Sequence, residues 1–120
     1  MARLTDPDLL ARYKQALSEW KVVGYIELKK DAYEGLRTTL PGLPEKEFKE
    51  ALCRFVCEEN GEIDQVKETR DWEPCNRWEY HYDLRPTING VKVYVETRLY
   101  PESFSSREEP EIHVVHIKPA

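Results

Sequence analysis

The sequence lacks several features that would assign a protein of 120 residues to a familiar class. It has three cysteines, an odd number that does not suggest the dense disulfide framework of small secreted domains. No apolar run approaches the roughly 18 residues needed to span a bilayer. The N-terminal residues lack the apolar core of a signal peptide. We therefore expect a cytoplasmic protein with no membrane partner.

An excess of positive charge is also missing. The formal net charge is −5, whereas a protein that wraps nucleic acid by charge alone is normally basic. This balance counts against a general DNA or RNA binder. It does not exclude a local basic site on a protein of negative net charge, because the local electrostatic field decides how a ligand approaches.

The composition is typical of a folded domain. Hydrophobic residues make up 40% and charged residues 34% of the chain, which includes three Trp and seven Tyr. The length suffices to bury one core, so we expect residues 1–120 to form a single domain. The order of elements described next predicts an α+β fold, with N-terminal helices packed on a C-terminal antiparallel β-sheet.

Helical signals fill the first half of the chain. Asp6 can cap a first helix, with Pro7 at its first position. Asp31 is a candidate cap for a second helix that runs toward Leu40. A third helix is expected after Pro44, ending at Asn60-Gly61. We expect residues 22–28 to form a short strand or an extended link, residues 63–69 an edge strand, and residues 71–76 a loop.

From Trp78 onward the apolar period changes from that of a helix to that of a strand. Apolar and polar residues alternate through residues 78–85 and again through 91–100, on either side of Asn89-Gly90. Residues 111–117 supply another strand after a polar loop. We expect an antiparallel sheet over about 78–117, with one apolar face and one face of ionisable side chains.

The turn of this hairpin can be built in two ways. A two-residue loop would make Pro86 and Val93 a hydrogen-bonded pair, and proline has no N–H to donate there. A four-residue loop of residues 88–91, closed by Thr87 and Lys92, moves Pro86 to a non-bonded site. We favour the four-residue loop.

Both loops place the same residues opposite one another. On the core side the expected pairs are Leu84 with Val95, Tyr82 with Thr97, and Tyr80 with Leu99. On the other side they are Arg85 with Tyr94, Asp83 with Glu96, and His81 with Arg98. Two carboxylates directly opposite destabilise a hairpin. The conflict fits a functional site, where local rules are broken, and equally a solvated face whose charges pair diagonally.

The side-chain types on this second face suit RNA cleavage without a metal. Such a reaction removes a proton from a ribose 2′-hydroxyl and returns one to the 5′-oxygen, which needs a positioned His or carboxylate. It also needs Arg or Lys near the phosphoryl oxygens. His81, Glu96, Arg85, Arg98 and Tyr94 supply these types. Tyr94 could instead simply pack over Arg85 as a cation–π pair.

The same region resembles a known family. The residues that carry the resemblance are His81-Tyr82-Asp83-Leu84-Arg85-Pro86, Gly90, Val93-Tyr94-Val95 and Val115-His116-Ile117-Lys118. They look like the C-terminal half of the MqsR-type messenger-RNA interferases, and Leu43-Pro44-Glu45-Lys46-Glu47-Phe48 resembles a helix start of that family. Together these segments cover about half of the chain.

The resemblance implies a RelE/MqsR-like fold and a toxin that cleaves messenger RNA without metal or cofactor and is controlled by an antitoxin. Tyr94 and Lys118 match catalytic residues of the family, and His81 falls where the family has a functional Gln. With Arg98 these form the expected catalytic group. Arg85, Glu96 and Lys49 are the expected RNA-binding residues. The family's helix lysine falls nearest Lys49 or Glu50, and the match does not choose between them.

Other constellations are weaker. Cys53 and Cys57 lie one helical turn apart, but a zinc site wants four ligands and no second pair exists in the sequence, so we expect no metal. His113 and His116 are expected to pack on the sheet or its surface. The alternative function is a noncatalytic protein-binding module that uses the same sheet face or the exposed helices.

Overall fold

A computed structural model describes residues 2–71, 78–102 and 109–120. Predictions that fall on residues 72–77 and 103–108, among them most of the two loops and Cys75, lie outside the described residues. The helices are α1 (Pro7–Ser18), α2 (Lys30–Thr39) and α3 (Glu45–Cys53), and α3 continues as the π-helical turn η1 (Arg54–Glu58). The strands are β1 (Ala2–Arg3), β2 (Ile26–Leu28), β3 (Asp64–Lys67), β4 (Tyr80–Leu84), β5 (Thr87–Ile88), β6 (Val91–Tyr100) and β7 (Glu111–Pro119). The predicted α+β class is confirmed.

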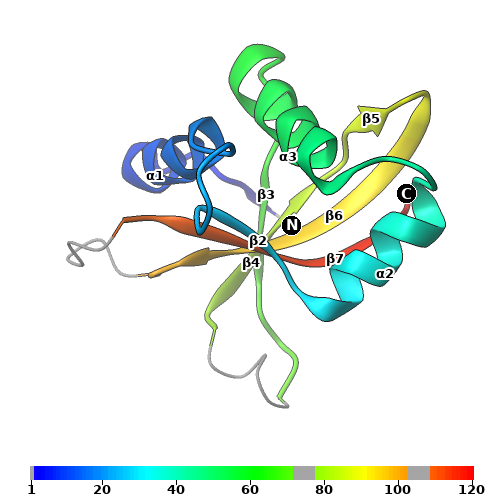
Figure 1. Cartoon of the computed structure of the whole chain (residues 1–120). Coiled ribbons are helices and arrows are strands. Elements are labelled where there is room, and N and C mark those ends of the chain that lie inside the picture. The colour runs from blue at the N-terminus through cyan, green and yellow to red at the C-terminus, as the bar shows by residue number, and fades with distance from the viewer. Residues whose placement is uncertain (1, 72–77, 103–108) are drawn as a thin grey trace.

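The strands form one sheet in the order β1-β3-β4-β6-β7-β2, and β5 pairs with β6 beside this path. The pairings β4–β6 and β6–β7 are antiparallel, as predicted for the C-terminal third. The sheet as a whole is mixed, because β2 lies parallel to β7. β3 is not the edge strand that the sequence predicted, since β1 pairs with its outer side. Figure 1 shows α1 and α3 on one side of the sheet, while α2 runs beside β7.

The start of α1 follows from local chemistry. The Asp6 side chain accepts hydrogen bonds from the backbone N–H groups of Asp8 at 2.9 Å and Leu9 at 3.1 Å. Pro7 occupies the first turn, where its missing N–H costs nothing. The predicted cap and the predicted proline position are both confirmed.

The second and third helices differ in how well their ends were predicted. Asp31 does not cap α2, because the helix begins one residue earlier and Lys29 is the N-cap without a side-chain bond. α3 begins directly after Pro44, as predicted. The helical segment ends at Asn60, whose φ of 53° is left-handed, as the Asn60-Gly61 signal predicted.

The favoured four-residue hairpin loop is wrong. Ile88 pairs with Val91, which leaves a two-residue turn of Asn89-Gly90. Both turn residues have positive φ, 52° and 79°, as a type I′ turn requires. The Val93 N–H donates to the Pro86 carbonyl at 2.9 Å. Pro86 therefore takes part in the ladder as an acceptor only. The one hydrogen bond that a backbone N–H at this position would donate is absent, and the two-residue turn is kept.

The core lies between the helices and one face of the sheet. The predicted pairs Tyr82–Thr97 and Leu84–Val95 are confirmed and buried. The Tyr13 hydroxyl of α1 lies 2.7 Å from the Thr97 hydroxyl, which donates to the Tyr82 carbonyl at 2.7 Å. These bonds satisfy the polar groups that this part of the core buries.

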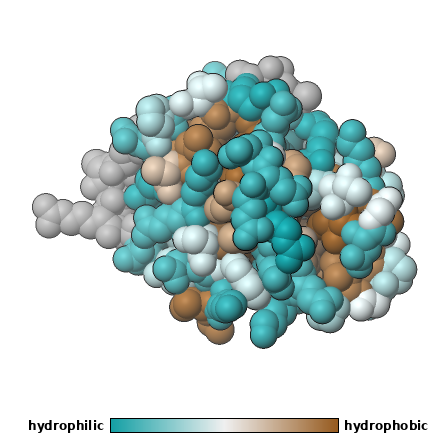
Figure 2. Space-filling model, turned by 90° about the horizontal axis from the view of Figure 1, so that it is seen from above, coloured by the Kyte–Doolittle hydropathy of each residue, from teal (hydrophilic) through white to brown (hydrophobic). Residues whose placement is uncertain are grey.

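The surface above the helices is mainly hydrophilic. Figure 2, seen from above Figure 1, shows separate small apolar patches among teal side chains. None of the helices in the described ranges has the length and apolar character needed to cross a membrane.

Candidate functional site: a buried charge network on the sheet

The sheet face opposite the core carries the ionisable side chains that strand alternation predicts. Asp83 and Glu96 are directly opposite one another, as expected. The centre of this face is not solvated: Asp83 is 3% exposed, while Glu96 and Arg98 are each 5% exposed. The His81 side chain is 12% exposed. The interpretation as an ordinary solvated face is therefore wrong for the centre of the sheet, because ionisable groups are rarely buried unless they are paired.

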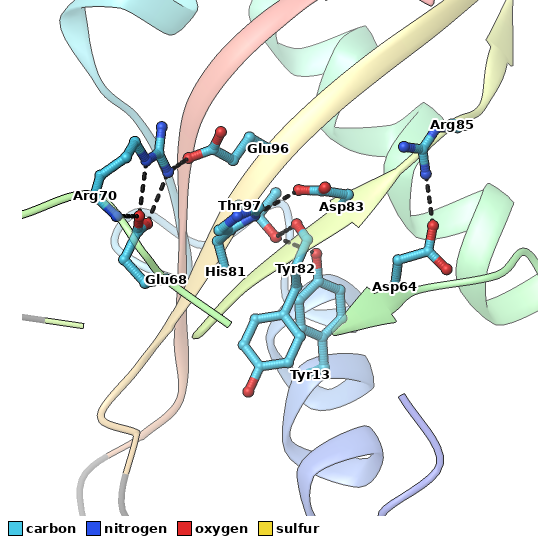
Figure 3. Close-up of polar contacts among 10 residues, drawn as sticks. All are labelled: Tyr13, Asp64, Glu68, Arg70, His81, Tyr82, Asp83, Arg85, Glu96 and Thr97. Atoms are coloured by element: carbon cyan, nitrogen blue, oxygen red, sulfur yellow. Dashed lines mark hydrogen bonds and ion pairs between the residues drawn. The ribbon is translucent and has the colours of Figure 1, made fainter. Parts of the chain in front are cut away.

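His81 and Asp83 form a bonded pair in the buried part of this sheet face (Figure 3). The Nδ1 atom of His81 lies 2.8 Å from the Asp83 carboxylate. Burial disfavours the charged imidazolium, but the hydrogen bond to Asp83 and the nearby charges of Asp83, Glu96 and Glu68 outweigh it and raise the pKa of His81. With Nδ1 directed to the carboxylate, the Nε2 atom is the one left for proton exchange.

Glu96 is neutralised by an arginine from another segment. The Arg70 Nη2 atom lies 2.5 Å from Glu96 and 2.7 Å from Glu68, so one guanidinium bridges two carboxylates (Figure 3). The Glu68 side chain is 1% exposed, and the bonds from Arg70 lower its pKa to about 2 despite burial. Two opposed carboxylates are thereby accommodated: Arg70 neutralises Glu96, and Asp83 is bound to His81.

Tyr94 joins this network to the cations of the sheet. Burial, the charges of Asp83 and Glu96 and a hydrogen bond to Asp83 raise the pKa of the Tyr94 hydroxyl, which therefore keeps its proton. The Tyr94 ring lies 5.4 Å from the Arg85 guanidinium and 5.0 Å from the Lys118 ammonium. The predicted Arg85–Tyr94 contact is confirmed. We call His81, Asp83, Tyr94, Glu96, Glu68 and Arg70 the buried charge network.

The cations differ in how far a ligand can reach them. Lys118 is exposed. Arg85 has a 36% exposed side chain and is bound to Asp64 at 2.5 Å. Arg98 is buried, with its guanidinium 5.5 Å from the Trp78 ring. Of these three cations, Lys118 and Arg85 can contact a ligand, whereas Arg98 is buried in the sheet.

Two of the predicted RNA-binding residues are placed differently from expectation. The Glu96 side chain is 6% exposed and is bound by Arg70, so it supports the network instead of meeting RNA. Lys49 lies on α3, 3.8 Å from Glu45 of the same helix. The structure joins His81 to Tyr94 through Asp83 and places Lys118 over the Tyr94 ring, whereas Lys49 lies on α3 and is not part of this group.

Glu68 and Arg70 are the members of the network that the sequence did not indicate. Both residues follow β3. Arg70 reaches the sheet face by binding Glu96, which lies 26 positions later in the sequence. Their spacing also allows a local pair, in which the Arg70 Nε and Nη2 atoms bind Glu68 at 2.8 and 2.7 Å. An acidic and a basic residue two positions apart after a strand are the one local signal that could have identified them.

His81, Asp83 and Glu96 present ligand atoms within 4.8 Å of one another, which is close enough to consider a metal. The donor set does not fit one well. Glu96 is already bound by the Arg70 guanidinium and Asp83 by His81 and Tyr94, so a cation would have to displace positive or hydrogen-bonded partners. The arrangement suits proton exchange at His81 better than metal binding.

Comparison with known proteins gives no match: no family model, no curated protein and no solved structure is similar to this chain. The fold and the site thus define the chain as an α+β protein with a buried acid–base network on one face of its sheet. The resemblance to the MqsR-type interferases stays a prediction.

Proposed function

We propose that the protein is a metal-independent endoribonuclease of the MqsR/RelE toxin type that cleaves messenger RNA. The observation that carries this proposal is the Asp83–His81 pair, with its 2.8 Å bond, linked through Asp83 to Tyr94 beside Lys118. A histidine held by a carboxylate is a group suited to general acid–base catalysis near neutral pH.

In the proposed reaction His81 takes the proton from a ribose 2′-hydroxyl through Nε2, while Asp83 holds the ring and stabilises the imidazolium. The 2′-oxygen bonds to phosphorus and the bond from phosphorus to the 5′-oxygen breaks. His81 then returns the proton to the 5′-oxygen, which leaves a 2′,3′-cyclic phosphate and a 5′-hydroxyl. Lys118 and Arg85 neutralise the charge on the phosphoryl oxygens, and Tyr94 keeps Asp83 in position.

The test is cleavage of a single-stranded RNA by tag-free protein in EDTA, followed on denaturing gels. We expect His81→Gln to reduce the rate by about 10²-fold or more, the usual contribution of a general acid–base group. His113→Gln is the matched control, because this histidine lies outside the buried charge network, and its rate should stay within about twofold. Mass spectrometry should find the cyclic phosphate end. Cleavage that survives His81→Gln removes His81 from the mechanism, and the absence of cleavage rejects the proposal.

A second candidate, a noncatalytic protein-binding module, is favoured by a groove elsewhere on the molecule. This groove has a volume of about 340 Å³ and lies between α3, η1 and the β5 end of the hairpin. Its apolar lining comes from Leu43, Ala51, Phe55, Pro86 and Ile88. Its charged residues are Glu47, Glu50, Glu59 and Arg54, and Arg54 is paired with Glu50 at 3.0 Å. An apolar floor with a mostly acidic rim suits a basic amphipathic segment of a partner protein.

The groove is tested by co-expression with the product of a neighbouring reading frame. A stable complex that is lost in Ala51→Arg, and kept in the surface control Lys67→Glu, places the partner in the groove. A complex that tolerates Ala51→Arg removes the groove as the binding surface. This result is independent of RNA cleavage, because Ala51 lies outside the buried charge network.

A further inference from the structure

A second cluster of ionisable groups lies at the β2 edge of the sheet, formed by Glu27, Glu111 and His113. Glu27 is the direct partner of His113 across the parallel β2–β7 pair, and Glu111 precedes His113 by two positions on the same face of β7. The ligand atoms of all three lie within 4.8 Å of one another. The His113 Nε2 atom is 4.0 Å from the Glu111 carboxylate. A ring nitrogen beside two carboxylates distinguishes this cluster from a simple group of acids.

The His113 ring is held in place by aromatic neighbours. Tyr100 stacks on it with ring centres 5.8 Å apart and an angle of 12°, and Trp78 meets it edge-on at 5.9 Å. These contacts limit the rotation of the ring and keep Nε2 near the carboxylates, so little conformational entropy is lost when that nitrogen binds a ligand.

The basic partner of Glu27 is held only weakly. The Glu27–Lys29 ion pair at 3.1 Å joins side chains that are 53% and 44% exposed, so it is weak and easily exchanged.

We propose that Glu27, Glu111 and His113 bind a divalent transition-metal ion, with Zn²⁺ as the favoured ion. One imidazole and two carboxylates are ligands that Zn²⁺ accepts, and three protein ligands leave a position for water or another ligand. At Zn–N and Zn–O distances of about 2.0–2.2 Å, tetrahedral ligand atoms lie about 3.4 Å apart. The ligand atoms lie within 4.8 Å of one another in the structure, and rotation of the two glutamate side chains can bring them to the shorter tetrahedral spacing.

The bound ion would tie the three-residue strand β2 to β7, because its ligands come from both strands. This site is separate from the buried charge network: His113 lies two strands from His81 along the order β4-β6-β7. The inference does not depend on the proposed ribonuclease activity, which is tested in EDTA. It also differs from the His81–Asp83–Glu96 group, whose carboxylates already have partners.

The test is titration of tag-free, full-length protein with ZnCl₂ by isothermal calorimetry, with Co²⁺ absorption as a second readout of ligand type. We expect one ion per chain, a tenfold or greater loss of affinity in His113→Gln and in Glu111→Gln, and unchanged affinity in the control His81→Gln. Zn²⁺ should also raise the melting temperature of the wild type but not of His113→Gln. Circular dichroism checks that each variant is folded, and Glu27→Gln, at an exposed position, serves as a third variant.

Three results would overturn the proposal. The first is the absence of saturable binding to the wild type. The second is binding that persists in folded His113→Gln and Glu27→Gln, which would place the ion elsewhere, for example at the Cys53 and Cys57 thiols. The third is binding lost in His81→Gln, which would move the ion to the buried charge network.

Discussion

Arg70 bridges two carboxylates that the sheet buries, so removing its charge should be costly. Its guanidinium lies 2.7 Å from Glu68 and 2.5 Å from Glu96, whose side chains are 1% and 6% exposed. Lowering the pKa of Glu68 from 4.5 to about 2 corresponds to about 3 kcal/mol, at about 1.4 kcal/mol per unit. Arg70 is itself 25% exposed, and water screens part of this interaction. We expect Arg70→Met to lower the free energy of unfolding at pH 7 by about 2–4 kcal/mol.

The chain offers a matched control on its surface. Arg54 also lies between two glutamates, Glu50 at 3.0 Å and Glu58 at 3.8 Å, but all three side chains are at least 45% exposed. Arg54→Met should change the free energy of unfolding by about 0.5 kcal/mol or less. Urea denaturation followed by tryptophan fluorescence measures both variants.

Acid provides a second readout with a definite sign. The folded-state pKa of Glu68 is lowered to about 2, so its contribution is fully present above pH 4.5 and is lost as pH falls toward 2. The wild type should therefore lose stability relative to Arg70→Met as the pH falls from 4.5 toward about 2. The reasoning is refuted if Arg70→Met costs no more than Arg54→Met, or if both proteins respond to acid in the same way.

Three further predictions concern the core, the helix packing and the site histidine. Tyr13→Phe removes the hydroxyl that bonds Thr97 at 2.7 Å inside the core, and should cost about 1–2 kcal/mol in urea denaturation; an unchanged midpoint would contradict it. Gly35→Ala would place a methyl group 2.0 Å from the backbone oxygen of Ile117, so we expect at least about 2 kcal/mol of destabilisation by thermal melting; a normal melting temperature would show that α2 can shift away. The raised pKa of His81 means that its stabilising contribution is present below its ordinary value of 6.5 and is lost as pH rises through the folded-state value. His81→Gln should abolish this part of the pH dependence, measured by urea denaturation from pH 6 to 9, and an identical pH profile would count against the His81–Asp83 pair.

The features that were predicted correctly depend on residues close together in sequence. The cap at Asp6, the helix start after Pro44 and the alternation from Tyr80 onward are all local, and each was found as expected. The opposition of Asp83 and Glu96 followed from counting outward from a short turn. Such features need only propensity and period, which a single sequence contains.

Two of the features that were missed depend on distant contacts. Nothing near Ile26 indicates that β2 pairs parallel with β7, more than 80 positions later. Arg70 reaches Glu96 only once β3 lies beside β4, so burial of the charged face was not foreseen. Pro86 has no N–H to donate, which disfavours the short turn, but in the structure its carbonyl accepts a hydrogen bond from the Val93 N–H. For β2 and Arg70 tertiary contacts decided between local possibilities, whereas the error at Pro86 concerned a local hydrogen bond within the hairpin.

The short outer strands have a consequence for how this protein behaves at high concentration. β1 and β2 end the sheet with two and three residues, and α2 approaches β7 so closely that Gly35 is needed at the contact. Long, flat outer strands offer unpaired backbone groups that recruit further chains and seed aggregates. Here β6 has strand partners on both sides, and β7 pairs with β6 along its length but with β2 only over residues 112–114, while α2 lies against β7 at Ile117. We therefore expect the protein to resist edge-to-edge association of its sheets at high concentration.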